Sequence, residues 1–497
     1  MDPTKFAHLI MLSTTLLAAS AMHDAVRNGG NMGEGVVIGS STTASTRGTR
    51  RSATKGCCRR PPSGGAGAST PARRATTSLS ARGSSRATCL PARPGRERTG
   101  RTSVAAGASM RRANAAPGGA ASASVSGVAP RAHLAFYQVC AAQGCSRGPI
   151  MHAVETALAD GVDILSLSLG DDDGLGFHED PVVAATASSS APRPATRARR
   201  RVGASSQQQG SPQHSATIPA FSSRGPSRNN GGVMKPDIVG PGVDILAVVP
   251  RSARGPSFAS LSGTSMSAPH LSGVAALVKS AHPTWSPAAI KSAIMTTADT
   301  SVTDETTGAP ASYFAMGAGL VNPAKAVDPG LVYDISPEEY IPYLCGLGYT
   351  DDQVNRIIFP APAVRCAGME NTEAKDLNSP SIMVELTEER PAVTVRRTVT
   401  NRGEARKIWR QAPPPLVTNV GAARSVYRVE MGAPEGLSVT VSPGELQFSE
   451  VNEKASFTVS VERALGSVSV PGVWGAQFAW VSEEHVVRSL ISISAKF

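Results

Sequence analysis

The strongest constraint on the fold is a strand, a helix and a second strand that follow one another within residues 133–169. The stretch HLAFYQV has the continuous apolar character of a buried strand, and Ile150, Val154 and Leu158 then recur at helical spacing. In DGVDILSLSLG, Ile164 and two serines alternate with leucines, which predicts a strand with one buried face. This succession predicts a right-handed βαβ unit in a parallel sheet.

The α/β pattern continues in the middle of the chain. Residues 235–249, KPDIVGPGVDILAVV, are a strand region interrupted by turn residues. The helix expected after it has an apolar face formed by Leu271, Val274, Leu277 and Val278. Ser286 and Pro287 then supply an N-cap and a first-turn proline for another helix. We therefore expect an α/β domain here.

The C-terminal part has a different periodicity. It contains short alternating stretches divided by Gly and Pro, namely AVTVRRTVTN, GLSVTVSPGELQF, ASFTVSVE and VVRSLISISA. Such stretches are typical of the strands of a β-sandwich. Residues 377–497 are therefore predicted to form a separate β-domain.

A low-complexity segment interrupts the patterned sequence. From residue 40 to about residue 126 the chain consists almost entirely of Arg, Ala, Ser, Thr, Gly and Pro, and residues 188–201 have a similar composition. A segment of this kind buries too little apolar surface to offset the entropy lost on ordering, so we expect disorder. GC-rich codons translated out of frame would give the same mixture.

The net charge of +11 raises the possibility of nucleic-acid binding. Its distribution argues against that function, because residues 40–130 hold 15 arginines and one lysine against a single acid, Glu97. The rest of the chain is net negative, and the basic segment lacks the interleaved aromatic residues expected of a nucleic-acid-binding surface. We expect no nucleic-acid partner.

The ends and the cysteines bear on the cellular compartment. Residues 1–21 have the order of a signal peptide, with Lys5, a moderately apolar run and a small-residue cleavage pattern, although a buried helix would have the same pattern. No run approaches the roughly 18 apolar residues of a membrane-spanning helix.

Among seven cysteines, two pairs are disulfide candidates in an exported protein, Cys140–Cys145 and Cys345–Cys366. No zinc-type spacing occurs, so we expect no metal site.

Ser265 is the candidate catalytic residue. It lies in GTSMSAPHLSG, where small residues lead directly into the predicted helix. Small neighbours allow a substrate backbone to approach, and a helix N-terminus favours a developing oxyanion. A serine at such a position is also an ordinary N-cap, so the position alone does not establish catalysis.

The whole string resembles the active-site serine motif of subtilisin-like serine proteases, and of plant subtilases in particular. The other segments that resemble this family are GEGVVIG, SGVAPRAHLAFYQVC, DGVDILSLSLG, FSSRGPS, MKPDIVGPGVDILA, SPAAIKSAIMTTAD, GAGLVNPAKAVDPGLVYD and LCGLGY. The resemblance implies an α/β fold, a subtilisin-like parallel sheet with flanking helices whose N-terminal part is degraded here, followed by a fibronectin-III-like β-sandwich.

The resemblance divides the chain into six segments. With the candidate signal peptide (1–21) described above, these are an N-terminal remnant of the peptidase domain (22–39), the low-complexity segment (40–125), the peptidase domain (126–330, disrupted at 188–212), a connector (331–376) and the fibronectin-III-like domain (377–497). The protease-associated insert usual in plant subtilases is absent between residues 206 and 218.

The resemblance also implies the site residues. Ser265 is the nucleophile, and Ser168, Leu169 and Gly170 match the strand whose backbone binds the substrate peptide. In this family a histidine is the general base and an aspartate orients it, in the chain order Asp, His, Ser. His270 belongs to the serine motif and is expected to be structural. Neither a cofactor nor a metal is implied.

The chain departs from the family at the remaining catalytic positions. Thr42 stands where the aspartate is expected, three residues after the glycine of VIG. Glu97 stands at the histidine position, and none of the nine histidines has the expected HGT context. Ser189 replaces the oxyanion-hole asparagine. Either the gene has decayed, or the translated frame is wrong across these segments.

Three hypotheses follow. The first is a secreted, extracellular serine endopeptidase that hydrolyses protein or peptide substrates through Ser265 and is impaired or inactive with this sequence. The second is a catalytically dead peptide-binding scaffold, or a faulty gene model of an active secreted protease. The third, nucleic-acid binding, is disfavoured by the charge distribution. The sequence leaves the oligomeric state and the substrate preference open.

Overall fold

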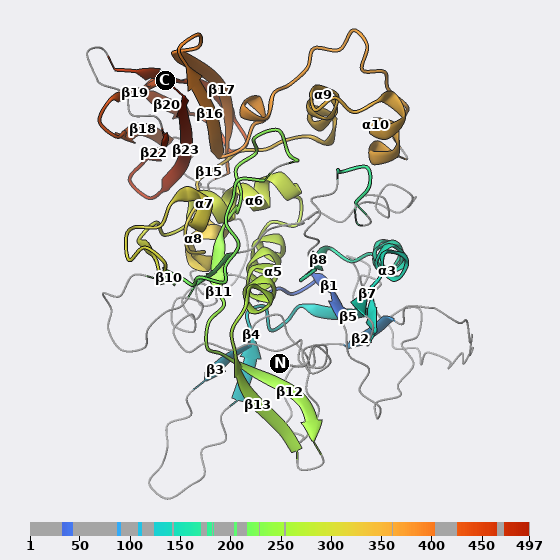
Figure 1. The fold of residues 1–497 in the computed structure, drawn as a ribbon. Coiled ribbons are helices and arrows are strands. Elements are labelled where there is room, and N and C mark those ends of the chain that lie inside the picture. The colour runs from blue at the N-terminus through green and yellow to red at the C-terminus, as the bar shows by residue number, and fades with distance from the viewer. Residues whose placement is uncertain are drawn as a thin grey trace, which may run out of the picture.

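The computed structural model describes residues 32–42, 87–90, 108–111, 124–141, 144–169, 176–180, 182, 203–205, 216–227, 229–252, 255–359, 361–402, 425–464 and 472–496. Figure 1 shows two parts, an α/β part and, above it, a β-sandwich that contains the C-terminus. Helices α9 and α10 lie beside the sandwich. The predicted combination of an α/β domain and a C-terminal sandwich is confirmed.

The α/β part is organised around a four-stranded sheet. Its strands, in spatial order, are β2 (Ala87–Leu90), β5 (His133–Gln138), β1 (Val37–Thr42) and β8 (Ile164–Ser166). Strand β1 runs parallel to both β5 and β8, whereas β2 is antiparallel to β5. The predicted strand–helix–strand unit is therefore present, with β1 inserted between its two strands.

Helices cover the two faces of this sheet. Helix α3 (Arg147–Ala159) packs its residues Val154 and Leu158 into one apolar cluster with Leu165 of β8. On the other face, Ile164 of β8 joins a cluster with residues of helices α5 and α6, including Val274. Strand β8 is therefore buried on both faces, which corrects the expectation of one buried face.

Helices α5 (Thr264–Ala281) and α6 (Pro287–Thr296) confirm the predicted helical pattern. The side chain of Ser286 caps α6 by accepting a hydrogen bond from the backbone N–H of Ala289, at 3.0 Å. This bond satisfies one of the donors that the first turn of a helix leaves without a partner. Two shorter helices follow, α7 (Tyr313–Met316) and α8 (Pro323–Val327).

Several two-stranded sheets surround this core. The antiparallel pairs are β3 (Ala108–Arg111) with β4 (Ser124–Gly127), β6 (Cys140–Ala141) with β7 (Gly144–Cys145), and β12 (Ile245–Ser252) with β13 (Gly255–Leu261). The parallel pairs are β9 (Gly203–Ser205) with β11 (Val239–Pro241) and β10 (Ala216–Ile218) with β14 (Val302–Asp304). Strands β2 and β3, the end of β1 and the first residues of β4 fall inside the segment expected to be disordered. The rest of that segment lies outside the described residues.

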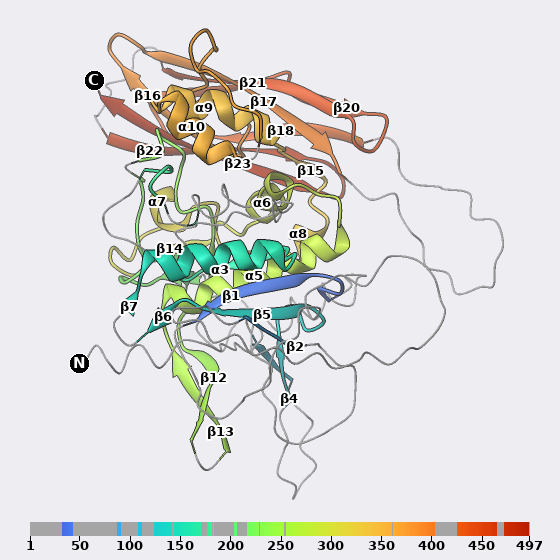
Figure 2. The ribbon, with the colours of Figure 1, turned by 90° about the vertical axis from the view of Figure 1, so that its right-hand side faces the viewer.

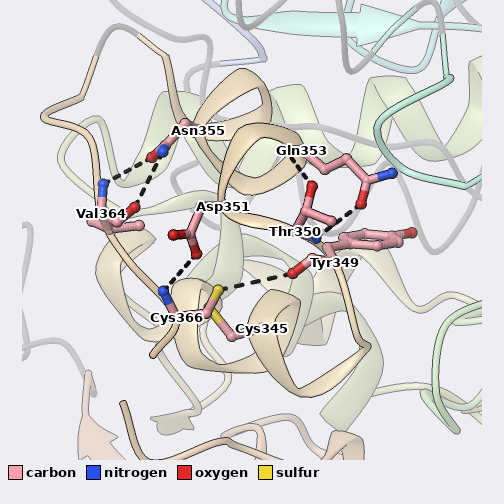
Figure 3. Close-up of a disulfide and its surroundings, with 8 residues drawn as sticks. All are labelled: Cys345, Tyr349, Thr350, Asp351, Gln353, Asn355, Val364 and Cys366. Carbon is pink, nitrogen blue, oxygen red and sulfur yellow. Dashed lines mark hydrogen bonds between the residues drawn. A yellow bond between two sulfur atoms is a disulfide. The ribbon is translucent and has the colours of Figure 1, made fainter. Parts of the chain in front are cut away.

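The connector holds one predicted disulfide. Cys345 and Cys366 are bonded, and they join helix α9 (Tyr340–Gly346) to the segment after α10 (Asp351–Ile358). Figure 3 shows that Asp351 accepts a hydrogen bond from the Cys366 backbone N–H, at 2.9 Å. Two short 3₁₀ helices flank this unit, Pro337–Glu339 and Ala374–Asp376.

The second predicted disulfide pair lies in a hairpin. The backbone of Cys140 in β6 is paired directly with that of Cys145 in β7, and Cys145 is disulfide-bonded. The side chain of Cys140 lies outside the part of the chain whose side chains are described. The pairing of these two cysteines therefore stays a prediction.

The sandwich packs a four-stranded sheet against a five-stranded sheet. The first sheet has the order β15 (Leu331–Val332), β17 (Ala392–Asn401), β21 (Lys454–Arg463), β19 (Leu437–Ser442). The second has the order β16 (Ser381–Thr387), β23 (Val486–Lys496), β22 (Gly472–Val481), β18 (Ser425–Gly432), β20 (Glu445–Phe448). Strand β15 lies in the sequence predicted as a connector, so the sandwich recruits residues from before residue 377.

Specific contacts join the two parts. The hydroxyl groups of Tyr333 and Ser489 lie 2.6 Å apart in a buried position, and Arg488 donates a hydrogen bond to the carbonyl oxygen of Ala298, at 3.1 Å. An ion pair connects His485 of the sandwich with Asp328, at 3.0 Å. Figure 2 shows helix α6 directly beneath β23 and β15. The sandwich is thus docked on the α/β part.

Candidate active site

Ser265 lies in the first turn of helix α5. Its side chain is half-buried, and its Oγ accepts a hydrogen bond from Ser168 Oγ, at 2.6 Å. Helix α5 is 18 residues long, so its N-terminus presents backbone N–H groups and the positive end of a helix dipole beside the Ser265 hydroxyl. The structure therefore brings together two of the residues that the sequence predicted for the site.

The position of Ser265 depends on how α5 is anchored. Ser267 donates a hydrogen bond to the carbonyl oxygen of Gly240 in β11, at 2.8 Å. A Cβ atom added to Gly240 would lie 2.8 Å from Ser267 Oγ, closer than real Cβ contacts come. A larger residue would press on Ser267 and Leu271, so the close approach of β11 to α5 explains Gly240, the first glycine of the IVGPG stretch.

His270 belongs to the scaffold of the helix. It is 1% exposed, and its Nδ1 lies 2.8 Å from the carbonyl oxygen of Met266, one turn earlier. Burial lowers the pKa of His270, which keeps the imidazole neutral at physiological pH. This environment agrees with the structural role expected for His270.

The predicted substrate strand lies next to Ser265. Ser168 and Leu169 are the second and third residues after β8 and are half-buried, and Leu169 packs against the apolar cluster that contains residues of α3. Gly170 and Ser189 lie outside the described residues. The hydroxyl pair formed by Ser168 and Ser265 was not predicted, because the two serines are 97 residues apart and only the folded sheet and helix bring them together.

The position expected for the acid is occupied by a threonine. Thr42 is the last residue of β1, paired with Gln138 of β5, and β1 is also the neighbour of β8, which leads to Ser168. A carboxylate at the carboxyl end of β1 would therefore face the same edge of the sheet as Ser168. Glu97 lies outside the described residues.

Six of the nine histidines are described, and they occupy other places: His133, His152, His178, His270, His282 and His485. Four of them have neighbours of their own. His178 lies against Gln353, His282 is stacked on Trp285, His485 pairs with Asp328, and His270 contacts Met266 as described above. Within the described ranges, Ser168 supplies the one hydrogen bond to Ser265 Oγ, and no general base accompanies it.

The described residues also lack a metal site and a membrane span. No group of three or more His, Cys, Asp or Glu among them is placed to hold a metal ion. None of their helices is both long enough and apolar enough to cross a membrane.

Comparison with known proteins agrees with both parts of the fold. Residues 102–319 match the subtilase family, and residues 411–493 match a fibronectin type-III domain. The match begins at residue 102, inside the segment expected to be disordered, so the end of that segment belongs to the region that matches the family.

Plant proteins are among the relatives. The chain is 40% identical over 300 residues to subtilisin-like protease SBT1.2 and 39% identical over 296 residues to subtilisin-like protease SBT1.6, both from Arabidopsis thaliana. It is 38% identical over 293 residues to subtilisin-like protease Glyma18g48580 from Glycine max. Each alignment covers 56% of this chain and 34–36% of the relative, so the chain spans about a third of the length of these relatives.

Proposed function

Residues 102–319 are a subtilase-family region, and on this premise we propose that the chain is a serine-type endopeptidase homologue that has Ser265 as its nucleophile but an incomplete triad. In this proposal the chain binds peptides along the residues after β8 and hydrolyses them at a strongly reduced rate. The single observation that carries the proposal is the pair of hydroxyl groups at the start of α5, with Thr42 where the acid is expected.

The proposed chemistry is acyl transfer. Ser265 Oγ attacks the carbonyl carbon of the scissile peptide bond, and the developing oxyanion lies at the N-terminus of α5, where backbone N–H groups stabilise negative charge. A complete triad transfers the Ser265 proton to a histidine, which then protonates the leaving amine. In this proposal solvent water takes up the proton, the C–N bond breaks as the amine is protonated by water, and a second water hydrolyses the acyl ester on Ser265. Ser168 donates a hydrogen bond to Ser265 Oγ and so holds the hydroxyl in place. Ser168 is not a base, so it does not take up the Ser265 proton.

The size of the defect follows from studies of subtilisin, a member of the same family. There, loss of the triad aspartate alone lowers kcat about 3 × 10⁴-fold, and loss of the histidine about 2 × 10⁶-fold. A serine without a base is a weak nucleophile at neutral pH. We therefore expect turnover at least about 10⁴-fold below that of a complete subtilase.

The proposal is tested with a peptidyl fluorophosphonate that reacts with nucleophilic serines. The protein with this exact sequence is incubated for hours with the probe, digested, and the modified residue is located by mass spectrometry. We expect slow modification of Ser265 that is absent in Ser265→Ala. The matched control is Ser272→Ala on the same helix, whose hydroxyl donates to the carbonyl oxygen of Ala268 and lies outside the proposed site.

A second candidate function, a peptide-binding scaffold without catalysis, is favoured by the threonine at the end of β1. The two proposals differ in one respect. Peptide binding with no modification of Ser265 supports the scaffold, whereas modification of Ser265 supports the impaired peptidase. If the chain neither binds peptides nor is modified at Ser265, the residues after β8 do not have the proposed function.

We further propose that the protein acts outside the cell on protein or peptide substrates. The disulfide between Cys345 and Cys366 supports this, because disulfides persist in oxidising compartments. Detection of the protein in the extracellular fluid of the producing tissue, with the N-terminal 21 residues removed, would test it.

A further inference from the structure

A cavity lies where the α/β part meets the sandwich, away from Ser265. It has a volume of about 530 Å³, and its walls come from helix α7, the turn after β18, and strands β22 and β23. Helix α7 lies close to β22 in both views of the molecule (Figures 1 and 2). A cavity of this volume is in the range that accommodates a small organic ligand.

Aromatic rings form part of its walls. Tyr313 and Phe314 line it from α7, and Trp474 lines it from β22. Tyr313 is fixed in place, because its ring packs against the backbone of Gly475, where an added Cβ would lie only 2.9 Å from the ring. Flat apolar faces held rigidly in this way suit a ligand that has a flat apolar face of its own.

Polar side chains line the same cavity. Gln477 of β22, Ser492 of β23 and Ser312 at the start of α7 all contribute to its walls. Ser312 makes no side-chain capping bond to its helix, and no hydrogen bond joins the Gln477 or Ser492 side chain to another described residue. Ser312 is exposed and Gln477 is half-buried, so their donors and acceptors are available to a ligand, whereas Ser492 is 2% exposed and only forms part of the wall. The described lining residues include no Asp, Glu, Lys, Arg or His, which favours a neutral ligand.

The strand arrangement leaves one alternative to a small ligand. Peptides are often recognised by adding a strand to a free sheet edge. Strand β22 is paired with β23 along Gly472–Val481 but with β18 only along Gln477–Val481, so the described strands leave Gly472–Ala476 without a partner on the β18 side. An added peptide strand at this edge is therefore the outcome that the test below must distinguish from binding by side chains.

We propose that this cavity binds a neutral saccharide. A sugar ring has an apolar C–H face that stacks on aromatic rings, and hydroxyl groups around its rim that pair with amide and hydroxyl side chains. The walls belong to both parts of the molecule, so a bound saccharide also strengthens the docking of the sandwich. The same chemistry is found in fragments of polysaccharides and in glycans attached to proteins.

The test is binding of four disaccharides to the full chain, measured by saturation-transfer NMR and by titration. Cellobiose and xylobiose represent polysaccharide fragments, and chitobiose and mannobiose represent protein glycans. We expect at least one to bind with a Kd below about 10 mM and to raise the melting temperature. Trp474→Ala and Gln477→Ala should each weaken binding at least tenfold, and Tyr340→Ala, an exposed aromatic residue on α9, is the matched control.

The outcomes are distinct. Absence of binding by all four disaccharides at 50 mM overturns the proposal, as does binding that neither variant weakens. Binding of a proline-rich peptide at this cavity in place of the disaccharides also overturns it. Gln477→Ala is informative even if Trp474→Ala fails to fold, because Gln477 lies on the strand surface and leaves the sandwich core intact.

Discussion

The sandwich and the α/β part are stabilised differently. The sandwich has one continuous core, in which Phe457 packs edge-on against Phe478 and Trp480 with ring centroids 5.7 and 5.0 Å apart. The described α/β part divides its apolar residues among separate clusters, on the two faces of a four-stranded sheet and beside it. Its candidate site depends on single residues at the ends of β1, β8 and α5. The packing of either part can therefore be retained when a single residue of the candidate site changes.

The largest effect is expected in the sandwich core. Trp480 is 0% exposed, so Trp480→Ala should lower the free energy of unfolding by about 3–5 kcal/mol through lost burial and a cavity. Trp480→Phe is the matched control, because it keeps an aromatic ring and removes a buried Nε1–H that has no hydrogen-bond partner among the described residues. Urea denaturation measures both. A loss below 1 kcal/mol for Trp480→Ala would contradict the single-core description.

The connector should show the next largest effect. Removal of the disulfide between Cys345 and Cys366, which are 21 residues apart, should cost about 3 kcal/mol through the entropy of the unfolded chain. The double variant Cys345→Ser/Cys366→Ser is compared with the oxidised parent by differential scanning calorimetry. An unchanged melting temperature would show that α9 and α10 unfold independently of the cooperative unit.

A smaller effect is expected in the α/β part. Ser286→Ala removes the cap of α6 and should cost about 1 kcal/mol. Ser301→Ala, in an exposed loop nearby, should change the stability by less than about 0.5 kcal/mol. If thermal denaturation shows equal effects for the two variants, the capping bond does not stabilise α6.

The smallest effect is a pH dependence at the junction of the two parts. The hydrogen bond and the charge of Asp328 raise the pKa of His485 above its ordinary value of 6.5, and Glu484 acts in the same direction. A raised folded-state pKa stabilises the fold fully below pH 6.5, and the contribution is lost as the pH rises through the folded-state pKa. Because Asp328 is 52% exposed, the contribution should be at most about 1 kcal/mol.

This pH dependence is measured as the difference in melting temperature between the parent and His485→Gln from pH 5.5 to pH 8.5. The difference should shrink as the pH rises, and Asp328→Asn should remove the trend. A difference that grows with pH would reverse the sign and contradict the ion pair.

The sequence predicted the elements with strong local patterns. Helices α5 and α6, the capping serine Ser286 and the alternating strands of the sandwich were found because their periodicity is local. The insertion of β1 between β5 and β8, the burial of both faces of β8 and the Ser168–Ser265 contact were not, because each depends on segments far apart in the chain. The roles assigned to Gly170 and Ser189 stay predictions.

The most direct test of the account compares hydrolysis of a fluorogenic peptide by the parent chain and by Ser265→Ala. Triad residues act as a unit, so removing the serine from a triad that is already incomplete should cost far less than removing it from a complete one. The account predicts a measurable fall in kcat/KM of less than about 10⁴-fold, because Ser265 still attacks but lacks its base. An unchanged kcat/KM would show that the residual hydrolysis does not pass through Ser265. A fall of about 10⁴-fold or more would show a working triad in this chain and would contradict the account.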